Sequence, residues 1–107
     1  MKLITAVVNK DDSMSVQSGL TSRGFQITRI ATTGGFLLSG NVTFLIGVGD
    51  DLVDEVIGII SELSSQRRQL VPPVSAYGSG VETAYPIEVV AGGATVFVQD
   101  VERFEKV

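Results

Sequence analysis

The sequence contains no cysteine, no histidine and no tryptophan. Without cysteine the chain has no disulfide, no thiolate zinc site and no cysteine nucleophile. Without histidine it lacks the commonest general base and the commonest ligand of transition metals. A nucleophilic site would have to use serine or threonine with lysine or a carboxylate. These absences favour a protein that binds a ligand over an enzyme, and we expect neither catalytic residues nor a metal site nor a cofactor.

Several phosphate-binding and catalytic motifs are missing or incomplete. No Walker A sequence occurs, and the segment 47–52 begins like a dinucleotide fingerprint but lacks its third glycine. Gly78-Ser79-Gly80 lacks the spacing of a nucleophile elbow. The acidic residues between positions 50 and 55 lack the spacing of a calcium loop. We interpret them as residues at the start of a helix, where negative charge is favoured.

Positive charge is scarce, since twelve acidic residues face eight basic ones and the net charge is −4. A protein that binds nucleic acid without sequence preference needs a basic face, so we expect no nucleic acid polymer as a partner. A small anionic ligand is compatible with this charge, because local donors matter more than the total. The chain has no run of about 20 apolar residues and no convincing secretory signal. We therefore expect a cytoplasmic protein without a membrane partner.

The hydrophobic patterns predict five strands and two helices in a single domain that spans residues 1–107. The strands are expected at 2–8, 25–30, 42–48, 86–90 and 94–98, and the helices at 13–23 and 50–63. Residues 11–13 are the candidate N-caps of the first helix, Gly24 is its candidate C-terminal glycine, and Asp50-Asp51 can cap the second. Residues 64–85 show no clear periodicity, and we expect a long loop there.

The predicted element order is β-α-β-β-α-β, in which the last β element is either one strand or a hairpin of two strands. This order predicts a ferredoxin-like α+β sandwich, in which two helices cover one face of an antiparallel sheet. The other face would remain in water in a monomer, so we expect the chain to associate with itself.

Glycine is abundant, at 12 of 107 residues against a usual share of roughly 7%. Five of the twelve lie between positions 34 and 49. Gly34-Gly35 follows two threonines and offers unshielded N–H groups that suit an oxyanion or phosphate. Phe36-Leu37 offers a wall for a purine, and Asn41 both donates and accepts, as an adenine edge requires. Residue types alone leave two interpretations open, a ligand site or a glycine-rich hairpin that simply turns.

The chain resembles the PII-like cyclic di-AMP receptor family of bacterial signal proteins over nearly its whole length. The resemblance is carried by Ala31–Leu37, Gly40–Gly47, Val53–Val56 and Gly92–Val98. It implies a homotrimer of ferredoxin-like subunits with one cyclic di-AMP in each of the three clefts between neighbours. It also implies a non-catalytic protein with a long loop after the second helix. Occupancy would pass through loop rearrangement to a downstream protein that the sequence does not name.

The resemblance also implies which residues contact the ligand. They are Thr28, Phe36, Leu37, Asn41, Gly47 and Phe97. Thr28 would offer its hydroxyl or backbone to the ligand, Phe36 and Leu37 would flank an adenine, and Asn41 would bond near the base or ribose. Gly47 would allow close approach of the backbone. Phe97 would close the pocket of its own subunit or of the adjacent one. Gln26 and Gly35 complete the candidate set.

Two positions depart from the family pattern. Members that bind cyclic di-AMP usually carry arginine at the positions of Gln26 and Leu38. Losing a guanidinium beside a phosphate costs about 1.5–3 kcal/mol, or roughly ten- to hundredfold in affinity. Arg29 is close in sequence, but strand alternation points it away from Thr28. Two alternatives follow: a sensor of another adenine nucleotide, or a trimeric interaction module with a decayed pocket.

Overall fold

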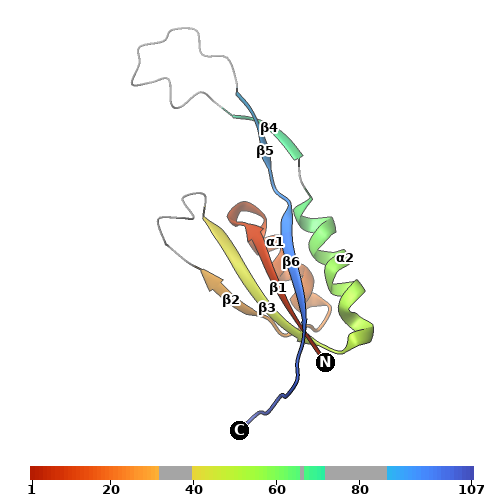
Figure 1. Ribbon diagram of the computed structural model, residues 1–107. Helices are drawn as coiled ribbons and strands as arrows, with labels where there is room; N and C mark the ends of the chain where they lie inside the picture. Colours follow the sequence, from red (N-terminus) through yellow and green to blue (C-terminus); the bar gives the residue numbers. More distant parts are fainter. Residues whose placement is uncertain (32–39, 66, 72–86) are drawn as a thin grey trace.

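The computed structural model describes residues 1–31, 40–65, 67–71 and 87–107. Its elements, in chain order, are β1 (Lys2–Asn9), α1 (Lys10–Ser22), β2 (Thr28–Ala31), β3 (Asn41–Val48), the 3-10 turn η1 (Asp50–Leu52), α2 (Val53–Ser64), β4 (Arg67–Val71), β5 (Ile87–Ala91) and β6 (Ala94–Asp100). The order is therefore βαββαβ, with β4 and β5 inserted between α2 and the last strand (Figure 1).

Four strands form one antiparallel sheet in the order β2-β3-β1-β6. Both helices lie on the same face of this sheet, and the two chain ends lie at the end opposite the β4–β5 pair (Figure 1). Strand order and helix placement together confirm the ferredoxin-like α+β sandwich that the sequence predicts.

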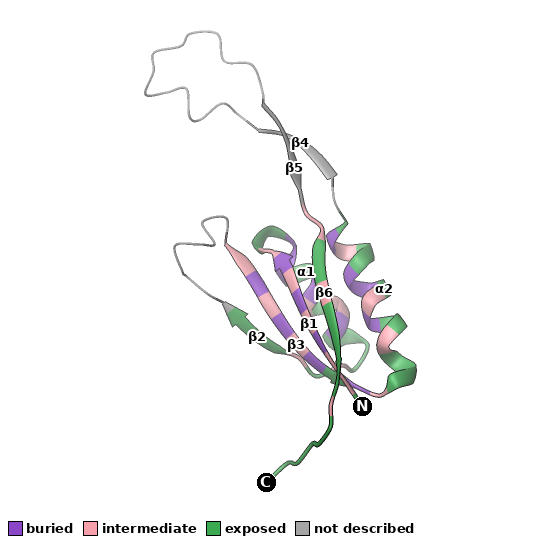
Figure 2. Ribbon diagram, in the orientation of Figure 1, coloured by how far each residue is buried: buried purple, intermediate pink, exposed green. Residues whose placement is uncertain are grey.

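The core fills the space between the sheet and the helices, as the purple segments in Figure 2 show. Successive side chains of a strand point to opposite faces, so β1 and β3 each bury every second residue here. The buried apolar residues of the core are Ile4, Ala6, Val8, Val16, Leu20, Val42, Phe44, Ile46, Val48, Val56, Ile59 and Ile60. We call this side of the sheet the covered face.

The opposite side, which we call the open face, is covered by none of the described elements (Figure 2). On β1 it presents Leu3, Thr5 and Val7, which are half-buried. On the edge strand β6 it presents Phe97, whose side chain is 55% exposed. The self-association that we expect from such a face stays a prediction.

The start of α1 corrects the predicted N-cap. The helix begins at Lys10, and the side-chain Oδ1 of Asn9 accepts a hydrogen bond from the N–H of Asp11 at 2.8 Å. Asn9 is therefore the cap, and the residues at 11–13 that we expected in this role lie inside the helix. β1 runs one residue past its predicted end, and α1 follows it directly, so the cap is the last residue of the strand.

The end of α1 confirms the prediction for Gly24, which has a φ of 85°. Its N–H donates to the carbonyl of Thr21 at 3.0 Å, and the N–H of Phe25 donates to that of Leu20 at 3.1 Å. This pair of bonds is the Schellman motif, which needs a left-handed residue after the helix. Phe25 then packs against the core, and β2 starts only at Thr28, later than the predicted 25.

The start of α2 also differs from the prediction. Asp50 and Asp51 form the 3-10 turn η1, and the residues before the two helical segments, Gly49 and Leu52, make no side-chain capping bond. Asp50 instead pairs with the α-ammonium of Met1 at 3.1 Å. The acidic pair at 54 and 55 does lie in the first turn of α2, where the helix dipole favours it.

The segment after α2 contains a strand that the sequence analysis missed. Arg67–Val71 forms β4 and pairs antiparallel with β5 in a separate two-stranded sheet. The predicted loop over 64–85 is therefore wrong for these five residues, and its part from 72 onward lies outside the described residues. The predicted strands near 86–90 and 94–98 are confirmed as β5 and β6.

Candidate functional site

A hollow of about 940 Å³ lies at the end of the sheet that carries the chain termini. It brings together three of the predicted site residues, Gln26, Thr28 and Gly47. The described residues that line it are Met1, Leu3, Gln17, Thr21, Phe25, Gln26, Ile27, Thr28, Leu45, Gly47, Val101 and Phe104. We call it the terminal hollow. Its volume lies within the range of about 300–1,000 Å³ that small-molecule sites occupy.

Strand register places the sheet residues of the terminal hollow side by side. Thr28 pairs with Leu45, and Leu3 pairs with Gly47, so these residues share the open face. A Cβ at Gly47 would meet only the Met1 side chain, at 3.5 Å, which is ordinary contact. The glycine therefore leaves the strand backbone accessible from the hollow, as close approach of a ligand requires.

Two polar residues of the terminal hollow were missed in the sequence. Gln17 and Thr21 come from α1, where their spacing of four places them on one helix face. This spacing of polar residues is visible in the sequence, although the apolar residues alone predict the helix. Nη1 of Arg29 donates to Oε1 of Gln17 at 3.0 Å and lies 3.1 Å from Sδ of Met14. Arg29 thus lies on the helix side, away from Thr28, as strand alternation predicts.

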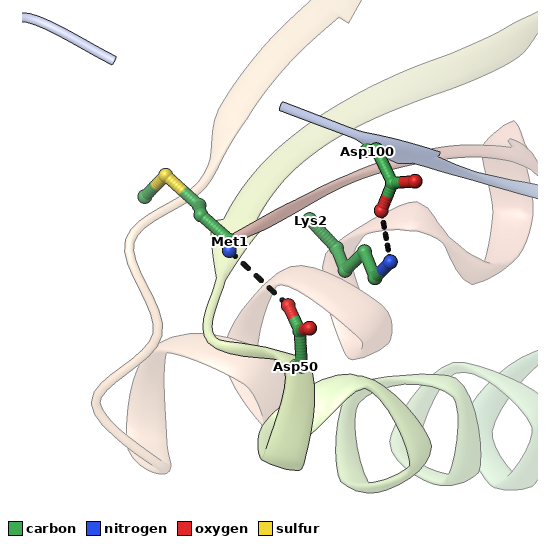
Figure 3. Close-up of polar contacts among 4 residues, drawn as sticks. All are labelled: Met1, Lys2, Asp50 and Asp100. Carbon is green, nitrogen blue, oxygen red and sulfur yellow. Dashed lines mark hydrogen bonds and ion pairs between the residues drawn. The ribbon is translucent and has the colours of Figure 1, made fainter. Parts of the chain in front are cut away.

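The terminal hollow is mostly apolar and almost uncharged. Among the described residues that line it, none has a charged side chain, and the α-ammonium of Met1 is the charge that they contribute. That group pairs with Asp50 (Figure 3). A phosphate placed here would meet amides, hydroxyls and backbone N–H groups rather than a guanidinium. This agrees with the sequence, which has Gln26 at a position where an arginine is expected.

An exposed ion pair between Lys2 and Asp100 joins the start of β1 to the end of β6 beside the terminal hollow (Figure 3). The hydrogen bond from Lys2 lowers the pKa of the Asp100 carboxyl, and the same bond raises the pKa of Lys2. The neighbouring N–H of Val101 donates to the carbonyl of Met1 at 3.1 Å. These contacts fix the point at which the C-terminal segment leaves the sheet.

Asn41 lies at the other end of the open face. It lines a second hollow, of about 460 Å³, whose lining is Val7, Val8, Asn9, Asn41, Gly92, Gly93, Ala94 and Thr95. We call it the hairpin hollow, because Gly92 and Gly93 connect β5 to β6 with φ values of 81° and 85°. Asn41 and Gly47 are six positions apart on β3, which corresponds to about 20 Å along the strand.

Phe97 lies between the two hollows and lines neither of them. It faces Thr5 across the β1–β6 ladder and is exposed on the open face. The structure therefore groups three predicted residues in one hollow and places Asn41 in another. Gly35, Phe36 and Leu37 lie outside the described residues. The ligand contacts assigned to all eight stay predictions.

The described part of the chain contains no cluster of three or more acidic, histidine or cysteine residues that could hold a metal ion. None of its helices is long and apolar enough to cross a membrane.

The sheet order, the helix layer and the extra strand pair define a ferredoxin-like fold of the PII-like class. A family model described as cyclic-di-AMP receptor matches residues 1–107. The chain therefore belongs to the cyclic-di-AMP receptor family, as its motifs indicate. It is also similar to a functionally unknown protein from Pediococcus pentosaceus ATCC 25745, known from a crystal structure. The identity is 37%, the TM-score is 0.78, and the match covers 99% of this chain and 96% of that one.

Proposed function

We propose that this chain is a non-catalytic, cytoplasmic receptor that binds cyclic di-AMP and signals its occupancy to another protein. The observation that carries the proposal is the family match over the whole chain. The function requires no cofactor and no reacting side chain. It agrees with a sequence that has no histidine and no cysteine.

The ligand binds in the clefts between the subunits of a homotrimer, each subunit being a single domain over residues 1–107. The spacing of the candidate residues supports this. Asn41 and Gly47 lie at opposite ends of β3, about 20 Å apart, so one base cannot contact both within a subunit. A cleft between two subunits can combine the terminal hollow of one with the hairpin hollow of the other. The half-buried and exposed apolar residues of the open face support association.

Occupancy is relayed through the segment that follows α2. Its described ends, β4 and β5, pair with each other and connect to the sheet through Gly92 and Gly93. Both glycines line the hairpin hollow, and the N–H of Gly93 donates to the carbonyl of Ser64 at the end of α2. A ligand beside Asn41 therefore reaches the base of the β4–β5 pair directly.

Titration calorimetry with cyclic di-AMP, cyclic di-GMP and ATP tests the proposal. We expect heat with cyclic di-AMP and a stoichiometry of one ligand per subunit. Absence of heat with all three nucleotides, at tens of micromolar protein, contradicts a nucleotide receptor. Sedimentation equilibrium should report a trimer, and a monomer would contradict binding in a cleft between subunits.

One observation favours a second candidate function. Because none of the described residues that line the terminal hollow has a charged side chain, this part of the pocket lacks a typical phosphate-binding group. A trimer that only binds a partner protein, with a decayed pocket, would show this feature too. The same titration separates the two functions. A response to ATP alone would instead indicate a sensor of another adenine nucleotide.

A further inference from the structure

We propose that Phe104 is an additional ligand-binding residue, and that the C-terminal segment 101–107 forms one wall of the terminal hollow. The group that occupies this hollow is an adenine base, which stacks on the Phe104 ring. The inference rests on the proposed function and names the part of the ligand that the terminal hollow receives.

The first argument is position. Val101 and Phe104 line the same hollow as Gln26, Thr28 and Gly47, although more than fifty residues separate the two groups in the sequence. The last strand ends at Asp100, so Phe104 reaches the hollow from a segment outside the sheet. Figure 1 shows this segment leaving the sheet beside the N-terminus.

The second argument is exposure. The Phe104 side chain is 65% exposed although its ring contributes to the wall of a large hollow. An aromatic ring in this position offers an uncovered face, and a purine stacked on it removes apolar surface of both partners from water. An aromatic side chain with one free face is the usual platform for a nucleobase.

The third argument is the chemistry of the opposite wall. Gln26 and Thr28 present an amide and a hydroxyl, which both donate and accept hydrogen bonds. Gln17 and Thr21 also line this wall, where Oε1 of Gln17 accepts from Arg29 and the Thr21 hydroxyl donates to the carbonyl of Gln17. The edge of adenine has the same mixed character, whereas a phosphate only accepts. Without a charged side chain, the terminal hollow suits a neutral base better than a phosphate.

The fourth argument is how the segment is attached. The N–H of Val101 bonds to the carbonyl of Met1, and the preceding Asp100 pairs with Lys2. Beyond this anchor, Arg103 and Glu105 pair with each other at 2.7 Å on either side of Phe104, and both are exposed. The anchor at Val101 therefore places the Phe104 ring beside the hollow.

A fluorescent variant tests the position directly. The chain contains no tryptophan, so Phe104→Trp introduces a single indole with the aromatic character of the original residue. We expect cyclic di-AMP to quench its emission and shift it to shorter wavelength. The matched control is Val107→Trp, which lies on the same segment, is exposed and does not line the hollow. An equal response at both positions, or none at position 104, overturns the inference.

Calorimetry on Phe104→Ala gives the energetic test. We expect cyclic di-AMP to bind about ten- to hundredfold more weakly, the usual effect of removing a stacked aromatic ring, while Phe104→Tyr binds as the wild type does. Unchanged affinity of Phe104→Ala, or a changed sedimentation coefficient, overturns this inference and leaves the receptor function intact. Absence of binding by the wild type overturns the proposed function itself and this inference with it.

Discussion

The two faces of the four-stranded sheet are built from the same strands but have different environments. Along β3, Phe44 points to the covered face and is completely buried, whereas its neighbour Leu45 points to the open face and lines the terminal hollow. Along β2, Arg29 reaches α1 and Thr28 faces the hollow. Because side chains alternate along a strand, adjacent residues contribute to different faces of the sheet. The covered face stabilises the subunit, and the open face holds the residues proposed to recognise the ligand.

The largest difference is expected between substitutions at Phe44 and Leu45. Phe44→Ala removes a fully buried ring and should lower the free energy of unfolding by about 3–5 kcal/mol. Leu45→Ala is the matched control on the open face and should cost about 1 kcal/mol, because its side chain is only half-buried. Urea unfolding followed by circular dichroism measures both. Equal losses would show that both faces are packed alike in solution, and would remove the basis of the comparison.

The second prediction restores the missing charge on the open face. Gln26→Arg places a guanidinium in the terminal hollow, and we expect cyclic di-AMP to bind roughly ten- to hundredfold more tightly. The control is Gln99→Arg, which adds the same charge at an exposed position of β6 that does not line the hollow. Calorimetry at two salt concentrations distinguishes a local contact from general attraction. Unchanged or weaker binding by Gln26→Arg would show that no phosphate of the ligand lies within reach of an arginine at position 26.

The third prediction compares the two residues of β2. Thr28→Val keeps the shape of the side chain but removes its hydroxyl, and should weaken cyclic di-AMP binding up to about tenfold, the effect of one hydrogen bond. Arg29→Gln removes the contact with α1 on the other face and should leave the affinity unchanged. Loss of affinity with Arg29→Gln but not with Thr28→Val would show that the ligand lies on the helix side of β2.

The sequence predicts those parts of the fold in which one face of an element is buried. β1 and β3 show clear alternation, and α2 shows a wide apolar stripe, because each packs against the core. β4 was missed for the opposite reason. It belongs to a two-stranded sheet separate from the main one, where pairing needs backbone hydrogen bonds but no alternating pattern. The cap of α1 was missed because several residues near its start are suitable caps, and the end of β1 selects among them.

The candidate site is less predictable than the fold. Gln26 and Thr28 are close in sequence, so the resemblance to a known family locates them together. Phe104 joins them only through the path of the chain after β6, and Gln17 only through the packing of α1 beside β2. Such residues have no common motif, since their proximity results from tertiary contacts. A sequence pattern within one segment therefore predicts only those lining residues that belong to this segment. The other lining residues are found only from the fold.

The smallest expected effect concerns two glycines on the helices that pack on the covered face of the sheet. At Gly58 of α2 a Cβ would meet no described atom outside its own helix within 4 Å, so no close approach to the sheet requires a glycine there. The close approach occurs at Gly19 of α1, where a Cβ would meet Leu63 and would lie 3.3 Å from Cγ2 of Ile59, both on α2. Gly58→Ala should therefore raise the free energy of unfolding by about 0.4–1 kcal/mol, because alanine favours the helix.

Gly19→Ala is the matched comparison, because it makes the same change at the contact between the helices. Its gain in helix propensity is offset by the shift that Leu63 and Ile59 must make, so we expect a smaller gain than at Gly58 or a net loss. Urea unfolding of both variants gives the difference. An equal gain at the two positions would show that the helices do not pack closely at Gly19 in solution. A loss at Gly58 would show that its outer surface is covered, and that the subunit has a further contact on the helix side.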